Sequence, residues 1–176
     1  MKADLQRYVK GQAGYTLVEL MVATSIGLIV MTGLTSVVLT SMRAASTAQS
    51  RVEASSQIRS FQSDAYEDFA LSGVPTLTNC APASPPPCTI SLSGLQATNS
   101  VSPTAGALQI TYSWNGTTVD RTVGSNPPHH VASSVAAFSA ALSGAAPNQT
   151  VVVTITVTVQ AYTETQTMQF YPRVNP

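Results

Sequence analysis

Apolar residues fill one long stretch near the start of the chain, which reads YTLVELMVATSIGLIVMTGLTSVVL from Tyr15 to Leu39. As a helix at about 1.5 Å per residue, its centre from Leu17 to Val38 extends to roughly 33 Å, enough to span the hydrocarbon core of a bilayer. Glu19 is the only formal charge in the stretch. An isolated carboxylate is costly inside a membrane, so the pattern predicts a membrane helix whose one acid needs a proton or a positively charged partner.

A helical pattern continues beyond this stretch, now with polar residues on most faces. Apolar or small residues recur every three or four positions and form one stripe: Ala45, Ala48, Val52, Ser55, Ile58, Phe61, Ala65 and Phe69. Ser72-Gly73 followed by Pro75 gives a helix stop. We therefore expect one helix from about Tyr15 to Leu71, with its second half packed on a folded domain.

Strand patterns begin after the predicted helix. Residues 74–105 resemble a loop apart from a short apolar piece at residues 89–92. Residues 108–114 alternate between apolar and polar side chains and are followed by Asn115-Gly116, a strong signal for a type I′ turn. We expect residues 117–123 to form the return strand of this hairpin.

Three further segments complete the pattern. Residues 131–142 fit either a helix or a strand, because their apolar spacing suits both. Residues 150–162 alternate over a long stretch and give the clearest strand, and residues 165–172 give a final one. One long helix followed by strands predicts an α+β fold, in which the helix packs on an antiparallel β-sheet.

The segment before the apolar stretch is short, polar and basic. Lys2, Arg7 and Lys10 outnumber Asp4, so the positive-inside rule keeps this end in the cytoplasm. A secretory signal peptide has its small-residue cleavage site after the apolar core. Here the small residue, Gly14, stands before the core, and cleavage there would leave the helix as the new N-terminus.

The sequence from Gly14 to Ala23, G-Y-T-L-V-E-L-M-V-A, resembles the class III signal of type IV prepilins and pseudopilins. The resemblance implies that a prepilin peptidase cuts between Gly14 and Tyr15 and methylates the amine of Tyr15. It also implies that Glu19, fifth in the mature chain, pairs with the N-terminal amine of a neighbouring subunit during filament assembly. Tyr15 departs from the phenylalanine common in the family but keeps an aromatic ring. A plain signal anchor is the alternative.

This resemblance divides the chain into four parts and implies a pilin-like fold. They are a cleaved leader (1–14), a transmembrane assembly helix (15–39), an amphipathic continuation (40–72) and a β-rich extracytoplasmic head (73–176).

Beyond Gly73 the chain has only four charged residues: Asp120, Arg121, Glu164 and Arg173. Phosphate binding needs clustered cations, so we expect no nucleic acid partner.

The only cysteines, Cys80 and Cys88, flank the proline-rich segment A-P-A-S-P-P-P. An exported domain would let them form a disulfide, whereas their spacing is not a zinc pattern and no nearby histidine completes one.

His129-His130 follows two prolines and is expected on a loop surface. The chain contains no G-x-S-x-G elbow, phosphate loop or H-E-x-x-H motif, so we expect no enzymatic activity, no cofactor and no metal.

The head also resembles W-type minor pilins and J-type pseudopilins in the order of its strands. Arg121, Phe138 and Arg173 are the matching positions. The resemblance implies a minor pilin with a priming or tip role; a J-type pseudopilin of type II secretion, a pilus-mounted adhesin and a major pilin are the alternatives. The implied partners are the prepilin peptidase and other pilins or pseudopilins. The implied location is the inner membrane in a single pass, then the pilus at the cell surface or a periplasmic pseudopilus.

Overall fold

The computed structural model describes residues 14–97, 105–145 and 149–172. Residues 1–13 of the predicted leader and Arg173 lie outside these ranges. The chain divides into two compact units, Met1–Ala45 and Ser46–Pro176, which we describe separately. One helix, α1 (Leu17–Leu71), extends through parts of both units, and its bounds match the predicted helix to within two residues.

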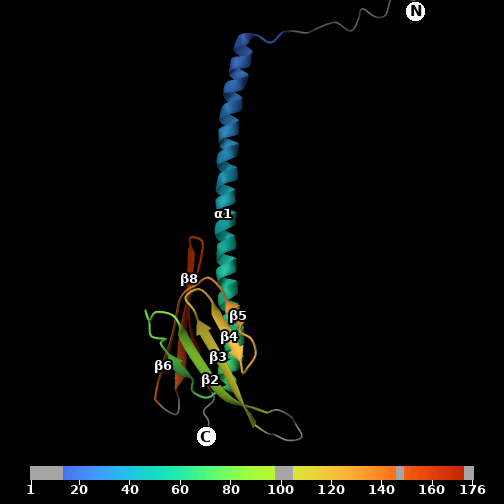
Figure 1. Cartoon of the computed structure of the whole chain (residues 1–176). Helices are drawn as coiled ribbons and strands as arrows, with labels where there is room; N and C mark the ends of the chain where they lie inside the picture. Colours follow the sequence, from blue (N-terminus) through green and yellow to red (C-terminus); the bar gives the residue numbers. More distant parts are fainter. Residues whose placement is uncertain (1–13, 98–104, 146–148, 173–176) are drawn as a thin grey trace, which may run out of the picture. The chain divides into compact units, whose positions relative to one another are not determined.

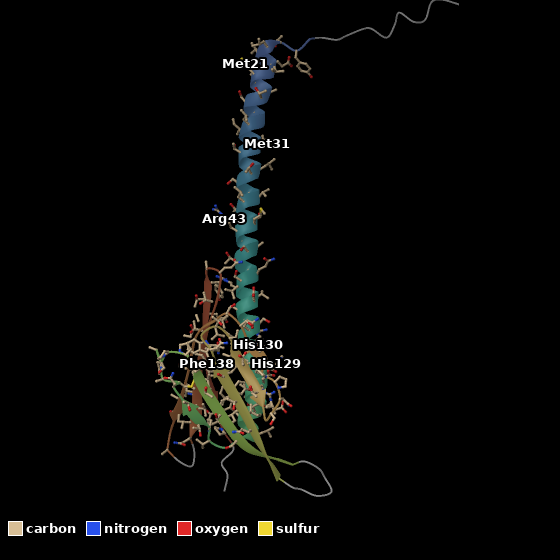
Figure 2. The ribbon with its side chains drawn as sticks, in the orientation of Figure 1. Met21, Met31, Arg43, His129, His130 and Phe138 are labelled. Atoms are coloured by element: carbon tan, nitrogen blue, oxygen red, sulfur yellow. A yellow bond between two sulfur atoms is a disulfide. The ribbon has the colours of Figure 1, made fainter. Side chains whose placement is uncertain are left out.

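In the first unit, the apolar part of α1 is not buried by any described residue. Its large apolar side chains are exposed, and Figure 2 shows Met21 and Met31 projecting from it. The most apolar window of α1 has a mean hydropathy of 2.0, and none of that window is buried. By length and composition, α1 can therefore cross a membrane.

The second unit combines the rest of α1 with two antiparallel sheets (Figure 1). We call the five-stranded one sheet A; its strands, in spatial order, are β1 (Thr76–Thr78), β2 (Cys88–Ala97), β3 (Ala105–Trp114), β4 (Val119–Val123) and β5 (His129–Ala132). Sheet B has the strands β6 (Val135–Ser143), β7 (Thr150–Val159) and β8 (Tyr162–Phe170). The α+β fold, with the helix packed against antiparallel sheets, is confirmed.

One segment differs from its sequence-based expectation, and a second, which fitted either a helix or a strand, is now assigned. Residues 74–105 are not mainly a loop, because they contain β1 and the ten-residue strand β2. The alternation there is short and is built from Cys88, Ile90 and Leu92, which are all buried. Residues 131–142 form the end of β5 and most of β6, so the strand alternative holds.

The buried face of α1 corrects the predicted stripe. The buried residues are Ser50, Ala54, Ile58, Phe61, Ala65, Asp68 and Phe69. The stripe was right from Ile58 onward, but wrong at Ala45, Ala48 and Val52, which are exposed. The true face at that level is lined by Ser50 and Ala54, whose small side chains carry little hydropathy signal.

Aromatic side chains join the helix to both sheets. The ring of Phe61 lies 5.6 Å from Tyr112 of sheet A and 5.5 Å from Phe138 of sheet B, centre to centre. Phe69 stacks on Phe170 of β8 at 4.5 Å. Edge-to-face and stacked pairs of this kind are each worth about 0.5–1.5 kcal/mol beyond the area that they bury. The core therefore lies where α1 meets the two sheets.

The turn between β3 and β4 is not the expected type I′ turn. That turn needs positive φ at both central residues, whereas of Asn115 and Gly116 only Gly116 has one, at 107°. The loop has four residues, since Trp114 pairs with Val119. The Asn115 side chain closes it by accepting hydrogen bonds from the backbone N–H groups of the next two threonines.

Candidate processing and assembly site

The start of α1 is fixed by Thr16, which directly precedes the helix. Its side-chain oxygen accepts a hydrogen bond from the backbone N–H of Glu19 at 3.3 Å, and its carbonyl accepts one from Leu20 at 3.2 Å. This is the geometry of a helix N-cap, which typically contributes about 1 kcal/mol to helix stability. The signal was present in the sequence as T-x-x-E, but Thr16 was not predicted to have this role.

The N-cap determines where the predicted cleavage residues lie. Gly14 and Tyr15 precede the helix, and the side chain of Tyr15 is 81% exposed. An extended, exposed peptide bond suits a protease better than a helical one, because its carbonyl and N–H are not held in helical hydrogen bonds. The start of the helix thus leaves the Gly14–Tyr15 bond outside the regular structure.

Glu19 lies in the first turn of α1. The unpaired N–H groups of a helix N-terminus favour a negative charge nearby. Within the described residues, the Glu19 carboxylate has no hydrogen bond and no ion pair. The chain therefore presents a carboxylate four residues from the predicted new amine of Tyr15, with its charge uncompensated by any described side chain.

Hydroxyl groups along the apolar part of α1 are bonded within the helix itself. Thr24 and Ser25 both donate to the carbonyl of Met21, and three further threonines donate to carbonyls three or four residues earlier: Thr32, Thr35 and Thr40. This back-bonding satisfies polar groups that would otherwise be costly to bury in hydrocarbon. Glu19 is the only charged side chain of this region, and its carboxylate has no partner among the described residues.

In the head, a buried polar cluster fastens α1 to sheet A. Arg121 donates from Nε and Nη2 to the two carboxylate oxygens of Asp68, at 2.6 and 2.7 Å, and the Tyr112 hydroxyl donates to the same carboxylate. Burial, then the bond to Asp68, raises the pKa of Tyr112 far above its ordinary value. The bond to Asp68 likewise raises the pKa of Arg121. Arg121 was one of the positions named from the sequence, whereas Asp68 was given no role there.

The structure joins Cys80 and Cys88 in a disulfide, as predicted. The backbone carbonyl of Cys80 also accepts a hydrogen bond from the N–H of Ala140, in β6. Phe138 lies in the same strand and is buried in the core. The disulfide loop therefore connects the first strands of sheet A with sheet B.

His129 and His130 lie at the start of β5 and not in a loop, although both are exposed (Figure 2). His130 Nδ1 contacts a carboxylate oxygen of Asp120, on the neighbouring strand β4. Asp120 and Arg121 point to opposite sides of β4, as adjacent strand residues do. Among the described residues, no group of three His, Cys, Asp or Glu side chains is placed to hold a metal ion.

Comparison with known proteins adds one finding, at the N-terminal end. Residues 9–35 match the family described as the prokaryotic N-terminal methylation motif. Neither a curated protein nor a solved structure matches the chain. The matched residues include Gly14, Tyr15, Thr16 and Glu19, so the motif coincides with the capped helix start. The chain thus carries a class III signal, consistent with a type IV prepilin or pseudopilin.

Proposed function

We propose that the chain is a minor type IV pilin-like subunit. A prepilin peptidase cuts it between Gly14 and Tyr15 and methylates Tyr15. The apolar part of α1 holds it in the inner membrane with the head outside the cytoplasm, until it joins other pilins in a pilus. It acts by association and not by catalysis, in a priming or tip role.

The observation that carries this proposal is the state of Glu19. The N-terminal methylation motif around Glu19 predicts processing at Gly14. Glu19 is the only charged residue on the exposed apolar part of α1, and its carboxylate has no partner among the described residues. A free amine on a neighbouring mature subunit would supply that partner, and this amine exists only after cleavage. Processing would therefore permit assembly by creating the group that neutralises Glu19.

Peptide mass spectrometry of two cell fractions tests the proposal. With trypsin, the uncut chain yields Gly11–Arg43, whereas the processed chain yields a peptide that begins at Tyr15, because neither Lys nor Arg occurs between residues 10 and 43. An N-methylated Tyr15 peptide in sheared surface filaments, at low abundance relative to the main subunit, would support a minor pilin. The same peptide confined to the envelope would favour a pseudopilin. An intact leader in both fractions would refute processing.

Substitution of Glu19 separates processing from assembly. We expect Glu19→Ala to be cut and methylated but depleted from the filament fraction, because its carboxylate is lost while Gly14 and Tyr15 remain. Glu53→Ala is the matched control, since Glu53 is an exposed carboxylate on the second half of the same helix. Normal incorporation of Glu19→Ala would contradict the proposed pairing.

A further inference from the structure

The four outer edges of the two sheets differ in how they are protected against pairing with another chain. Exposed edge strands offer unpaired backbone groups, and proteins usually shorten, cover or interrupt them. In sheet A, β1 has three residues and β5 has four, with a register shift where β4 meets β5. In sheet B, β6 has a register shift and its backbone bonds to Cys80.

Strand β8 has none of these protections. It pairs with β7 over nine residues without a register shift, and its only charged residue is Glu164. The charge of Glu164 does not protect the free edge of β8 against pairing, because its carboxylate accepts a hydrogen bond from Ser55 on α1 at 2.8 Å. Within the described residues, only β7 forms backbone hydrogen bonds with β8.

The hairpin geometry determines which backbone groups of β8 are free. Two residues, Gln160 and Ala161, connect Val159 to its pair partner Tyr162. In a two-residue hairpin this flanking pair is hydrogen-bonded, and bonded and non-bonded pairs then alternate along an antiparallel ladder. The residues of β8 in the non-hydrogen-bonded pairs direct their backbone N–H and C=O groups away from β7. They are Thr163, Thr165, Thr167 and Gln169. All four are exposed.

The threonine side chains agree with this assignment. Thr163, Thr165 and Thr167 form hydroxyl–hydroxyl bonds of 3.0–3.1 Å with three threonines of β7: Thr158, Thr156 and Thr154. Such short side-chain contacts are typical of non-hydrogen-bonded pairs, whose Cα atoms approach to about 4.5 Å. The free backbone groups and the threonine rows thus belong to the same residues.

We propose that the free edge of β8 pairs with β8 of a second copy of this chain, antiparallel and centred on Gln166. In this register Thr163 faces the partner's Gln169 and Thr165 faces the partner's Thr167, so all eight free backbone groups find partners. A shift of the centre to Thr165 or Thr167 would leave some of them unpaired within the strand. The threonine rows would continue across the junction.

Charge is compatible with this register. Glu164 faces the partner's Met168 and lies about 13 Å along the strand from the partner's Glu164, at about 3.3 Å per residue. No like charges therefore meet at the junction. Because each copy offers one such edge, the two-fold contact closes after two molecules.

The direction of the contact gives it a role distinct from filament assembly. From its start to its end, β8 contacts α1 in sequence order: Tyr162 lies against Arg51, Glu164 against Ser55 and Phe170 against Phe69. Both elements therefore run in the same direction, and a two-fold axis perpendicular to sheet B reverses both. Subunits of one filament share a direction, so the contact would join copies from two filaments. This last step rests on the proposed function, whereas the pairing itself does not.

Disulfide trapping of the full chain, purified in detergent, tests the pairing without requiring processing or filaments. The chain has no free cysteine in its described residues, and Cys80 and Cys88 are already paired. In Gln166→Cys, the new thiols of two copies would face each other in a non-hydrogen-bonded pair, within the Cα separation that a disulfide needs. Thr163→Cys is the matched control, because its thiols would lie far apart along the junction.

We expect oxidation to link Gln166→Cys into dimers and to leave Thr163→Cys monomeric. Adding Thr165→Lys to Gln166→Cys should lower the dimer yield roughly five- to tenfold, because two unfavourable charges enter the junction. Adding Ala137→Lys, which lies on β6 at the opposite side of sheet B from β8, should leave the dimer yield unchanged. Circular dichroism would check that both variants fold. Equal linking of Gln166→Cys and Thr163→Cys, no linking of either, or linking of Gln166→Cys in cells only to a different protein would overturn the proposal.

Discussion

Removal of Arg121 tests whether the buried cluster fastens α1 to sheet A. Asp68 is 3% exposed, and Arg121 holds both of its carboxylate oxygens. Arg121→Leu would leave that carboxylate buried with only the Tyr112 hydroxyl as a donor. Breaking one side of a buried ion pair costs about 3–5 kcal/mol. We expect Arg121→Leu to lower the free energy of unfolding by about 3 kcal/mol, the low end of this range. The Arg121 side chain is 26% exposed, so water can partly replace it.

A double-mutant cycle isolates the interaction from the loss of packing. Asp68→Asn keeps an oxygen for Tyr112, and the partly exposed Arg121 can turn to solvent, so we expect a cost of about 1.5–2 kcal/mol. The double variant removes the stranded carboxylate as well as its partner. We expect it to cost about 2 kcal/mol less than the sum of the two single changes.

Urea unfolding of the full chain in detergent measures these free energies. Trp114 is the only tryptophan and is 7% exposed, so its fluorescence reports unfolding of the head. Arg59→Leu is the control, since Arg59 is exposed on α1, and it should change the free energy of unfolding by less than about 0.5 kcal/mol. A cost below about 1 kcal/mol for Arg121→Leu, or additive single changes, would refute the reasoning.

Two further predictions concern the head. Above pH 10, unfolded Tyr112 loses a proton that the folded state retains, because its folded pKa is raised; stability should therefore be complete below pH 10 and fall by up to about 1.4 kcal/mol per pH unit above it. Urea titrations should show a shallower alkaline fall in Tyr112→Phe, and equal slopes would contradict the assignment. Replacing Cys80 and Cys88 together by serine should cost about 2–3 kcal/mol, from the chain entropy of so short a loop. An unchanged urea midpoint in that variant, compared with the oxidised parent, would show that the loop is already ordered without the disulfide.

The long helix was predictable because its signals are local. An apolar stretch, a glycine–proline stop and a spacing of three or four residues all lie within α1, and the helix follows them to within two residues. The register of its buried face was less predictable near Val52, which is 71% exposed. A single large apolar residue in an otherwise polar segment outweighed the small residues Ser50 and Ala54, which mark the true face because they let the helix approach the sheets.

Contacts between distant residues left no local signal. Asp68 lies 44 residues from Tyr112 and 53 from Arg121 in sequence, and nothing around it in the sequence distinguishes it from the exposed acids of the same helix. The prediction of the β3–β4 turn was wrong for a related reason. Asn115-Gly116 predicts a two-residue hairpin, but the four-residue loop is closed by the Asn115 side chain, whose bonds compete with the simple turn.

Asp68 and Glu19 show how one helix uses two carboxylates in opposite ways. Both would be costly to bury without a partner. Asp68 obtains its partners from the chain itself, since Arg121 and Tyr112 converge on it when the head folds. The Glu19 carboxylate has no hydrogen bond or ion pair with any described side chain, and the nearby hydroxyls of Thr24 and Ser25 donate to a helix carbonyl. The fold therefore satisfies one acid internally and leaves the other to a group from outside the chain. Under the proposed function, a neighbouring subunit's N-terminal amine would meet that need only after cleavage next to Tyr15, and assembly would then depend on processing.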